Sequence, residues 1–128
     1  MRTHMSVLTM AALLLTVPAA GARPQPSLEQ LEPETRMIEL CDIAVSDRIA
    51  RETDYSRIDR LVASAVSDAQ AAADKVLAEG AAFRNQGHWY GLRYACRLNP
   101  EHDAVEALRY AIGHEIPETS WEQYGLWR

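Results

Sequence analysis

The sequence of 128 residues lacks the motifs that mark several large classes of enzyme. It contains no nucleophile elbow, no phosphate-binding loop and no zincin helix, so no motif indicates a catalytic class. Its length fits one ordinary domain and excludes arrays and multidomain architectures. Acidic residues outnumber basic ones, 18 Asp+Glu against 13 Lys+Arg, and a nucleic-acid partner is therefore not expected.

A long apolar run is also missing. Residues 7–17 are mostly apolar, about 11 residues against the ~20 that a helix needs to cross a bilayer. Arg2 precedes this run, and the small residues at positions 18–22 follow it, which is the three-part pattern of a secretory signal peptide. We predict a signal peptide over residues 1–22, cleaved before Arg23, and no stable membrane anchor after cleavage. A retained anchor is the alternative.

The rest of the chain is more acidic than the whole. The first 22 residues hold one arginine and no acidic residue, so their removal leaves 12 basic and 18 acidic side chains, a net charge of −6 over 106 residues. Residues 23–30, with Pro24 and Pro26, are predicted to form an extended leader, because proline does not continue a helix. Residues 31–128 are predicted to form a single domain that can bury a core.

Cysteine is scarce, with Cys41 and Cys96 the only two in the chain. Neither lies in a C-x-x-C pair, which argues against a redox enzyme. In an oxidising compartment two cysteines of a small domain pair, and a bond closing so long a loop contributes on the order of 4 kcal/mol in the loop-entropy model. We predict a Cys41–Cys96 disulfide, with two inert buried thiols or one reactive thiol as alternatives.

Residues 33–52 are predicted to form an amphipathic helix. Pro33 suits the first helical turn and Glu34 favours the positive end of the helix dipole. The apolar residues that fall on one face are Ile38, Cys41, Val45 and Ile49. The acidic residues Asp42, Asp47 and Glu52 are then expected on a solvated face.

Two later segments have the period-two alternation of half-buried strands. Residues 88–98 place apolar side chains at even positions, so Cys96 is expected to point toward the core. Residues 99–103 have the composition of a loop, and residues 104–113 alternate again. We predict an antiparallel hairpin whose matching apolar faces pair Tyr94 with Leu108 and Leu92 with Tyr110.

The other segments are less regular. Residues 81–85 are expected to form a short strand that reaches a tight turn at Gln86-Gly87. Residues 58–79 favour helix by alanine content, although residues 61–66 also fit a strand. Near the C-terminus, residues 119–122 and 120–123 match a capping box, and Gly125 is expected to end a short helical turn. The aromatic residues of this segment, predicted to cover the core as a lid, are Trp121, Tyr124 and Trp127.

Together these segments resemble an alphaproteobacterial domain of unknown function, family DUF930, from about residue 28 to the end. The residues that carry the resemblance are 31–36 (Leu-Glu-Pro-Glu-Thr-Arg), 41–43 (Cys-Asp-Ile), 80–84 (Gly-Ala-Ala-Phe-Arg), 89–90 with Cys96, 110–113 (Tyr-Ala-Ile-Gly), 115–117 and 121–126 (Trp-Glu-Gln-Tyr-Gly-Leu). The resemblance implies an exported, periplasmic domain and supplies no reaction, ligand or catalytic residue. It also favours a strand near residues 61–67. It leaves residues 68–75 open, because positions 69–73 depart from the family with a nearly all-alanine run.

Three arginines share the outward face of the predicted hairpin: Arg93, Arg97 and Arg109. In one allowed register Arg93 lies opposite Arg109, a like-charge contact that a bound carboxylate or phosphate would relieve. The alternatives are a register that differs by two residues, or neutralisation by nearby acidic side chains, namely Glu101, Asp103 or Glu115.

Two further candidates lie near this face. Trp89 is the one large aromatic residue at an outward position, where it either anchors a partner or is covered by the C-terminal segment. His88 and His114 could meet at the open end of the hairpin as weak metal candidates, but a third ligand is missing unless Glu115 turns inward. No cofactor is predicted.

The sequence thus predicts an α+β fold in which one amphipathic N-terminal helix packs on a small, mainly antiparallel sheet. A single disulfide crosslinks helix and sheet, and a short helical turn ends the chain. The expected function is a non-enzymatic binding module of the cell envelope, acting in the periplasm on an envelope protein or an anionic envelope component through Trp89, Arg93, Arg97 and Arg109. A small hydrolase built on His88 and His114, or a purely structural accessory domain, are the alternatives.

Overall fold

The computed structural model describes residues 27–128, so the predicted signal peptide and residues 23–26 of the predicted leader lie outside the described residues. One long helix, α1 (Pro33–Glu52), is followed by the strands β1 (Ile58–Val62), β2 (Gln70–Ala72), β3 (Lys75–Asn85), β4 (His88–Leu98) and β5 (Val105–Glu115). Short 3₁₀ turns lie at η1 (Leu28–Gln30), η2 (Glu118–Ser120) and η3 (Glu122–Tyr124). The predicted α+β fold is confirmed.

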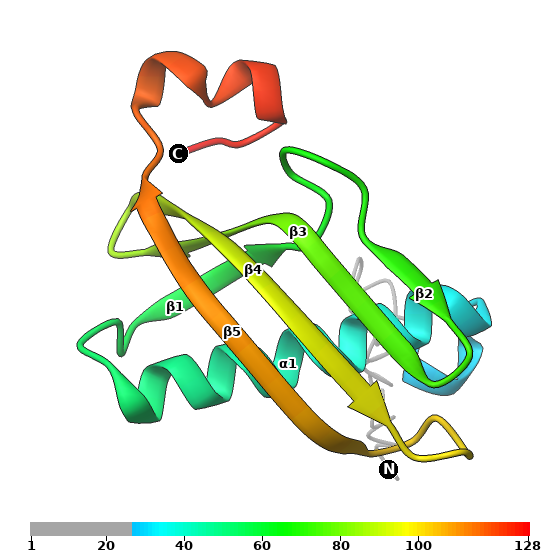
Figure 1. The fold of residues 1–128 in the computed structure, drawn as a ribbon. Helices are drawn as coiled ribbons and strands as arrows, with labels where there is room; N and C mark the ends of the chain where they lie inside the picture. Colours follow the sequence, from blue (N-terminus) through cyan, green and yellow to red (C-terminus); the bar gives the residue numbers. More distant parts are fainter. Residues whose placement is uncertain (1–26) are drawn as a thin grey trace, which may run out of the picture.

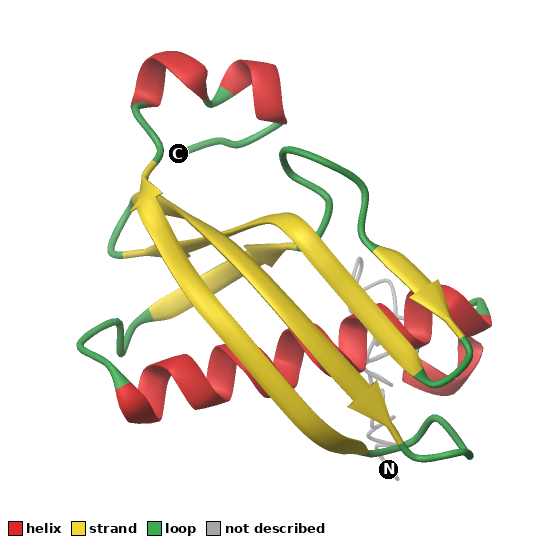
Figure 2. Cartoon of the chain, in the orientation of Figure 1, coloured by secondary structure: helices red, strands yellow, loops and turns green. Residues whose placement is uncertain are grey.

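The strands form one antiparallel sheet in the order β1-β3-β4-β5, and β2 pairs with the first residues of β3. In Figure 1, α1 crosses behind β3, β4 and β5, so this helix covers one face of the sheet. Figure 2 shows the same two layers by secondary structure, with the two C-terminal turns at one end of the sheet. In residues 27–128, no helix is both long and apolar enough to cross a membrane.

The helix begins and ends where its sequence predicts, with Pro33 in the first turn. Its buried side chains include Met37, Cys41, Val45 and Ile49, and they pack on the even-numbered residues of β4. The prediction that Asp42 is solvated is wrong. Its position falls at the edge of the apolar stripe, and the residue is only 8% exposed.

The predicted disulfide joins these two layers. Cys41 on α1 and Cys96 on β4 are bonded, with their Cα atoms 6.1 Å apart, and both residues belong to the core. Since the bond closes a loop of 55 residues, it removes much of the freedom of the unfolded chain.

The β4–β5 register differs by two residues from the predicted one: Tyr94 lies opposite Tyr110, and Leu92 lies opposite Ile112. The loop after β4 runs one residue longer than expected, closed by the bond from Asn99 N–H to the Ala104 carbonyl. A bulge between Arg97 and Leu98 adds the second residue. A shift of two keeps every side chain on its predicted face, because strands alternate with a period of two.

Three other segments depart from expectation. β1 lies earlier than the predicted strand at 61–67, and β3 begins six residues before the predicted 81–85. The alanine-rich segment forms the β2–β3 hairpin, where cross-strand pairing outweighs helix propensity. The described end of the leader is the 3₁₀ turn η1 rather than extended chain.

Two turn predictions have opposite outcomes. The Gln86-Gly87 turn is confirmed, with φ of +51° and +79°, the left-handed pair that a tight antiparallel hairpin needs. The C-terminal capping boxes are wrong, because neither η2 nor η3 has a side-chain cap. The N-cap residues of the turns are Pro117 and Trp121, and neither residue has a side-chain oxygen that could accept a hydrogen bond from the first turn. Gly125 does end η3, at φ +65°.

Candidate functional site

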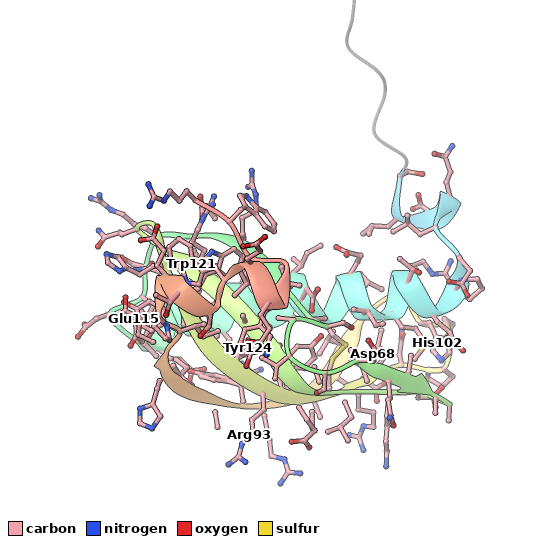
Figure 3. The ribbon with its side chains drawn as sticks, turned by 90° about the horizontal axis from the view of Figure 1, so that it is seen from above. Asp68, Arg93, His102, Glu115, Trp121 and Tyr124 are labelled. Atoms are coloured by element: carbon pink, nitrogen blue, oxygen red, sulfur yellow. A yellow bond between two sulfur atoms is a disulfide. The ribbon has the colours of Figure 1, made fainter. Side chains whose placement is uncertain are left out.

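The face of the sheet turned away from α1 is here called the outer face. In Figure 3, α1 lies on one side of the sheet and the labelled Arg93 lies on the other. On β4 the even positions, such as Tyr94 and Cys96, point into the core beneath α1, and the odd positions point to the outer face. The outer face has two parts, which differ in whether another segment of the same chain covers them.

The first part, the closed end, consists of Ala82, Arg84 and Trp89 beneath the C-terminal segment 116–128. Trp89 is completely buried. Its indole N–H donates a 2.7 Å hydrogen bond to the Trp127 carbonyl, and the two rings meet edge to face at 5.4 Å. Trp121 and Leu126 complete this second small core. Trp89 therefore has no surface to offer a partner, and the alternative, coverage by the C-terminal segment, is the correct one.

Arg84 is the charged residue of the closed end, and it is 9% exposed. Its guanidinium donates two hydrogen bonds to the Asp59 carboxylate, of 2.9 and 2.7 Å, and lies 5.7 Å from the centre of the Trp89 ring. This paired arrangement holds the pKa of Asp59 below its ordinary value. The pair was not predicted, because its two residues are 25 positions apart and no local pattern links them.

The second part, the open end, consists of Lys75, Leu77, Arg93, Ala95, Arg97, Ala107, Arg109 and Ala111. The register places these residues in three adjacent rows across β3, β4 and β5. Lys75, Arg97 and Ala107 form one row; Leu77, Ala95 and Arg109 form the next; and Arg93 and Ala111 form the third. Across the β4–β5 pair each arginine therefore faces an alanine, whereas on the β3 side Arg97 faces Lys75.

This pattern decides between the alternatives for the arginines. The two-residue register shift places Arg93 opposite Ala111, so no like-charge pair forms with Arg109. Within residues 27–128, no carboxylate oxygen lies within 4.0 Å of the nitrogens of Arg93 or Arg109. Arg97 has only a long contact of 3.9 Å with Glu106. The alternative of a register that differs by two residues is therefore correct, and the like-charge contact that a bound anion would have relieved does not form.

The open end is hollowed. A hollow of about 420 Å³ is lined by Leu77, Arg93, Ala95 and Arg109, among others. It shares Leu77, Ala95 and Arg109 with a second hollow of about 420 Å³ toward Lys75 and Arg97. It also shares Arg93, Ala111 and one acidic residue, Glu79, with a third of about 310 Å³ toward Gly113. The three form one trough along β4, which we call the arginine trough.

The two histidine candidates are not brought together. His88 Nδ1 lies 2.6 Å from Glu115 Oε1, and the β4–β5 pairing ends at Tyr90 and Glu115, so His88 has no partner on β5 in the ladder. Among the described residues, no group of three His, Cys, Asp or Glu side chains could hold a metal ion.

The core side of the sheet holds one unusual acid that the sequence pattern missed. Tyr94 donates a 2.5 Å hydrogen bond to Asp42 Oδ1. Burial raises the pKa of Asp42 to about 7, although this hydrogen bond works in the opposite direction. A groove of about 290 Å³ between α1 and β1 runs beside it, lined by four acidic side chains and one arginine but by no histidine: Glu39, Asp42, Asp47, Asp59 and Arg60, with Ser46.

The chain matches one family model, whose description is Domain of Unknown Function (DUF930), over residues 28–126. No curated protein matches the chain, and neither does any solved structure.

Proposed function

The chain belongs to the DUF930 family, whose description names no activity, and from its geometry we propose that the protein is a non-enzymatic binding module. The arginine trough is the proposed binding site, and its ligand is an anion. Arg93, Arg97 and Arg109 provide the positive charge. Trp89, which the sequence placed in the same site, is part of the closed end and takes no part.

The observation that carries this proposal is an excess of positive charge in the trough. Lys75, Arg93, Arg97 and Arg109 line it, against one acidic lining residue, Glu79, and Arg97 lies 3.9 Å from Glu106. Arg93 and Arg109 have no carboxylate within 4.0 Å among the described residues, and the whole chain carries a net charge of −5. An acidic protein gains nothing in solubility from a local cluster of arginines of the minority sign. Guanidinium groups bind carboxylates and phosphates through paired hydrogen bonds, so an anionic ligand fits the cluster best.

We place this activity in the periplasm, on an envelope protein or an anionic component of the cell envelope. Two features support the compartment. Residues 1–22 have the composition of a secretory signal peptide, and Cys41 and Cys96 form a disulfide, which persists in oxidising compartments.

A small hydrolase is the second candidate, and Asp42 is the observation in its favour, because buried acids with a pKa near 7 are common in active sites. Yet the Asp42 carboxyl is held by Tyr94, and its groove brings no histidine to it. A base without a nucleophile or a second proton carrier makes no catalytic unit, so binding remains the better proposal.

The test compares two triple variants on an immobilised polyanion, heparin. The first variant carries Arg93→Gln, Arg97→Gln and Arg109→Gln. The control carries Arg51→Gln, Arg57→Gln and Arg60→Gln, which removes the same charge from exposed positions on α1, the following loop and β1. We expect the unaltered protein and the control to be retained at low salt and the trough variant to flow through. Equal retention of all three proteins would refute the proposed site.

A further inference from the structure

The arginine trough has a regular charge spacing along its length. Its three rows are centred on positions 93, 95 and 97 of β4, and each row carries at least one cation: Arg93, then Arg109, then Arg97 with Lys75. Glu79 lines the hollow at the Arg93 end, so positive charge is in greatest excess toward Arg97 and Lys75. Neighbouring rows are two residues apart, which is about 7 Å in an extended strand. The cations thus form a ladder parallel to the strands.

The cations do not converge on one point. Because each arginine of the β4–β5 pair faces an alanine, the guanidinium groups are related diagonally between these strands, and only Arg97 has a cation, Lys75, directly across from it on β3. A single phosphate or carboxylate could bind one or two of them but could not reach all three rows. A ligand that uses the whole trough must be elongated and must repeat its negative charge.

Building on the proposed function, we propose that the ligand is an extended polypeptide segment with carboxylate side chains at every second residue. In an extended chain the side chains at positions i, i+2 and i+4 lie on one face, about 7 Å apart. This is the spacing of the three rows. Three carboxylates on one face of such a segment would each meet one row of the ladder.

The floor of the trough suits a peptide backbone. Ala95, Ala107 and Ala111 are small, so a second chain can approach the sheet closely between the arginines. Leu77 lies in the middle row and is 43% exposed, which offers one apolar contact to a side chain of the ligand. The trough thus offers a short acidic segment both charge complementarity and one apolar contact.

Two other polyanions fit the same surface less well. A bilayer would meet a hollowed surface whose middle row offers a single apolar side chain, Leu77, so lipid headgroups could not contact all three rows at once. A polysaccharide would find no exposed aromatic ring to stack on at the open end, because Trp89 is buried. These two classes are outcomes of the test and not part of the proposal.

The test uses the purified protein and two fluorescein-labelled peptides of equal composition and charge. In one peptide three glutamates alternate with threonine, and in the other the three glutamates are contiguous. Fluorescence anisotropy at low salt measures both affinities. We expect the alternating peptide to bind at least threefold more tightly, and we expect this preference to disappear in the Arg93→Gln, Arg109→Gln variant. Arg57→Gln, an exposed change outside the trough, should retain the preference.

The outcomes separate this inference from the proposed function. Equal affinity for the two peptides, or a preference that survives the double substitution, overturns the matched spacing while anion binding at the trough stands. Binding of heparin or of phosphatidylglycerol vesicles without binding of either peptide also overturns it, and assigns the trough to another polyanion. Failure to bind any of these probes overturns the inference and the proposed function together.

Discussion

The closed and open ends of the outer face belong to the same strands, yet their arginines differ in burial and in pairing. Arg84 at the closed end is covered by the C-terminal segment and makes two hydrogen bonds to Asp59. Arg93 at the open end, nine residues later in the chain, has no carboxylate within 4.0 Å among residues 27–128 and no covering chain.

The difference follows from desolvation. A guanidinium that is taken out of water must be paired, because an unpaired buried charge costs several kcal/mol. Arg84 meets this requirement with Asp59 and with the rings of Trp89 and Trp127. Arg93 stays hydrated and needs no partner to be stable. The closed end thus pairs its buried charge internally, and the open end keeps its charges in water.

The largest expected effect comes from breaking the closed end at its centre. Trp89→Ala should remove about 3–5 kcal/mol from the free energy of unfolding, because it empties a fully buried site and leaves the Trp127 carbonyl with only its long 3.5 Å hydrogen bond from Arg84. Urea unfolding followed by circular dichroism measures the loss. The matched control is Trp127→Ala, which should cost less because Trp127 is 45% exposed. A loss below about 1 kcal/mol for Trp89→Ala would contradict the described packing.

Trp89 also shows where sequence reasoning ends. The alternation of residues 88–98 correctly predicts the bounds of β4 and the outward direction of Trp89. Whether an outward residue is exposed depends on the C-terminal segment, which folds back from more than 25 residues later in the chain. The sequence offered coverage as one of two alternatives, and local periodicity has no means of choosing between them.

The same limit explains why the sequence did not predict the cross-strand partners of the arginines. The apolar faces of β4 and β5 match in any register that differs by two residues, so the pattern predicts the face of Arg93 and Arg109 but not their partners. The bulge and the loop length decide the register, and both depend on backbone geometry. The helix and the disulfide were predictable because a long amphipathic stripe and a single possible cysteine pair leave few alternatives.

A second prediction concerns the pH dependence of stability that comes from Asp42, a residue that belongs to neither end. The folded pKa of Asp42 is about 7, above its ordinary value of 3.8, so the folded state binds the proton more tightly than the unfolded state does. The stability from Asp42 is fully present below pH 3.8 and is lost as the pH rises toward 7. The slope is at most roughly 1.4 kcal/mol per pH unit.

Urea unfolding at pH 5 and pH 8 tests this dependence. The unaltered protein should be clearly more stable at pH 5, and Asp42→Asn should flatten the difference while it leaves an acceptor for the Tyr94 hydroxyl. Asp47→Asn, an exposed change on the same helix, should keep the slope. If Asp42→Asn and the unaltered protein show the same dependence, then another group is responsible.

The smallest and most direct contrast replaces one arginine at each end. Arg84→Gln should cost about 1 kcal/mol or somewhat more, since it breaks two charged hydrogen bonds whose acceptor, Asp59, remains half exposed to water. Arg93→Gln should change the free energy of unfolding by less than about 0.5 kcal/mol, as exposed substitutions do. Urea unfolding at pH 6 gives both values, and equal losses would mean that the two ends do not differ.

The pH dependence of these two variants tests whether the ion pair of Arg84 with Asp59 causes the difference between them. Arg84 holds the pKa of Asp59 below 3.8, so its stabilisation is fully present above pH 3.8 and is lost as the pH falls through the lower folded value. The deficit of Arg84→Gln should therefore shrink between pH 6 and pH 2.5, while that of Arg93→Gln stays near zero. In a double-mutant cycle, Asp59→Asn should absorb most of the Arg84 effect and none of the Arg93 effect. A deficit of Arg84→Gln that persists at pH 2.5 would instead assign the role of Arg84 to its packing between Trp89 and Trp127, which does not titrate.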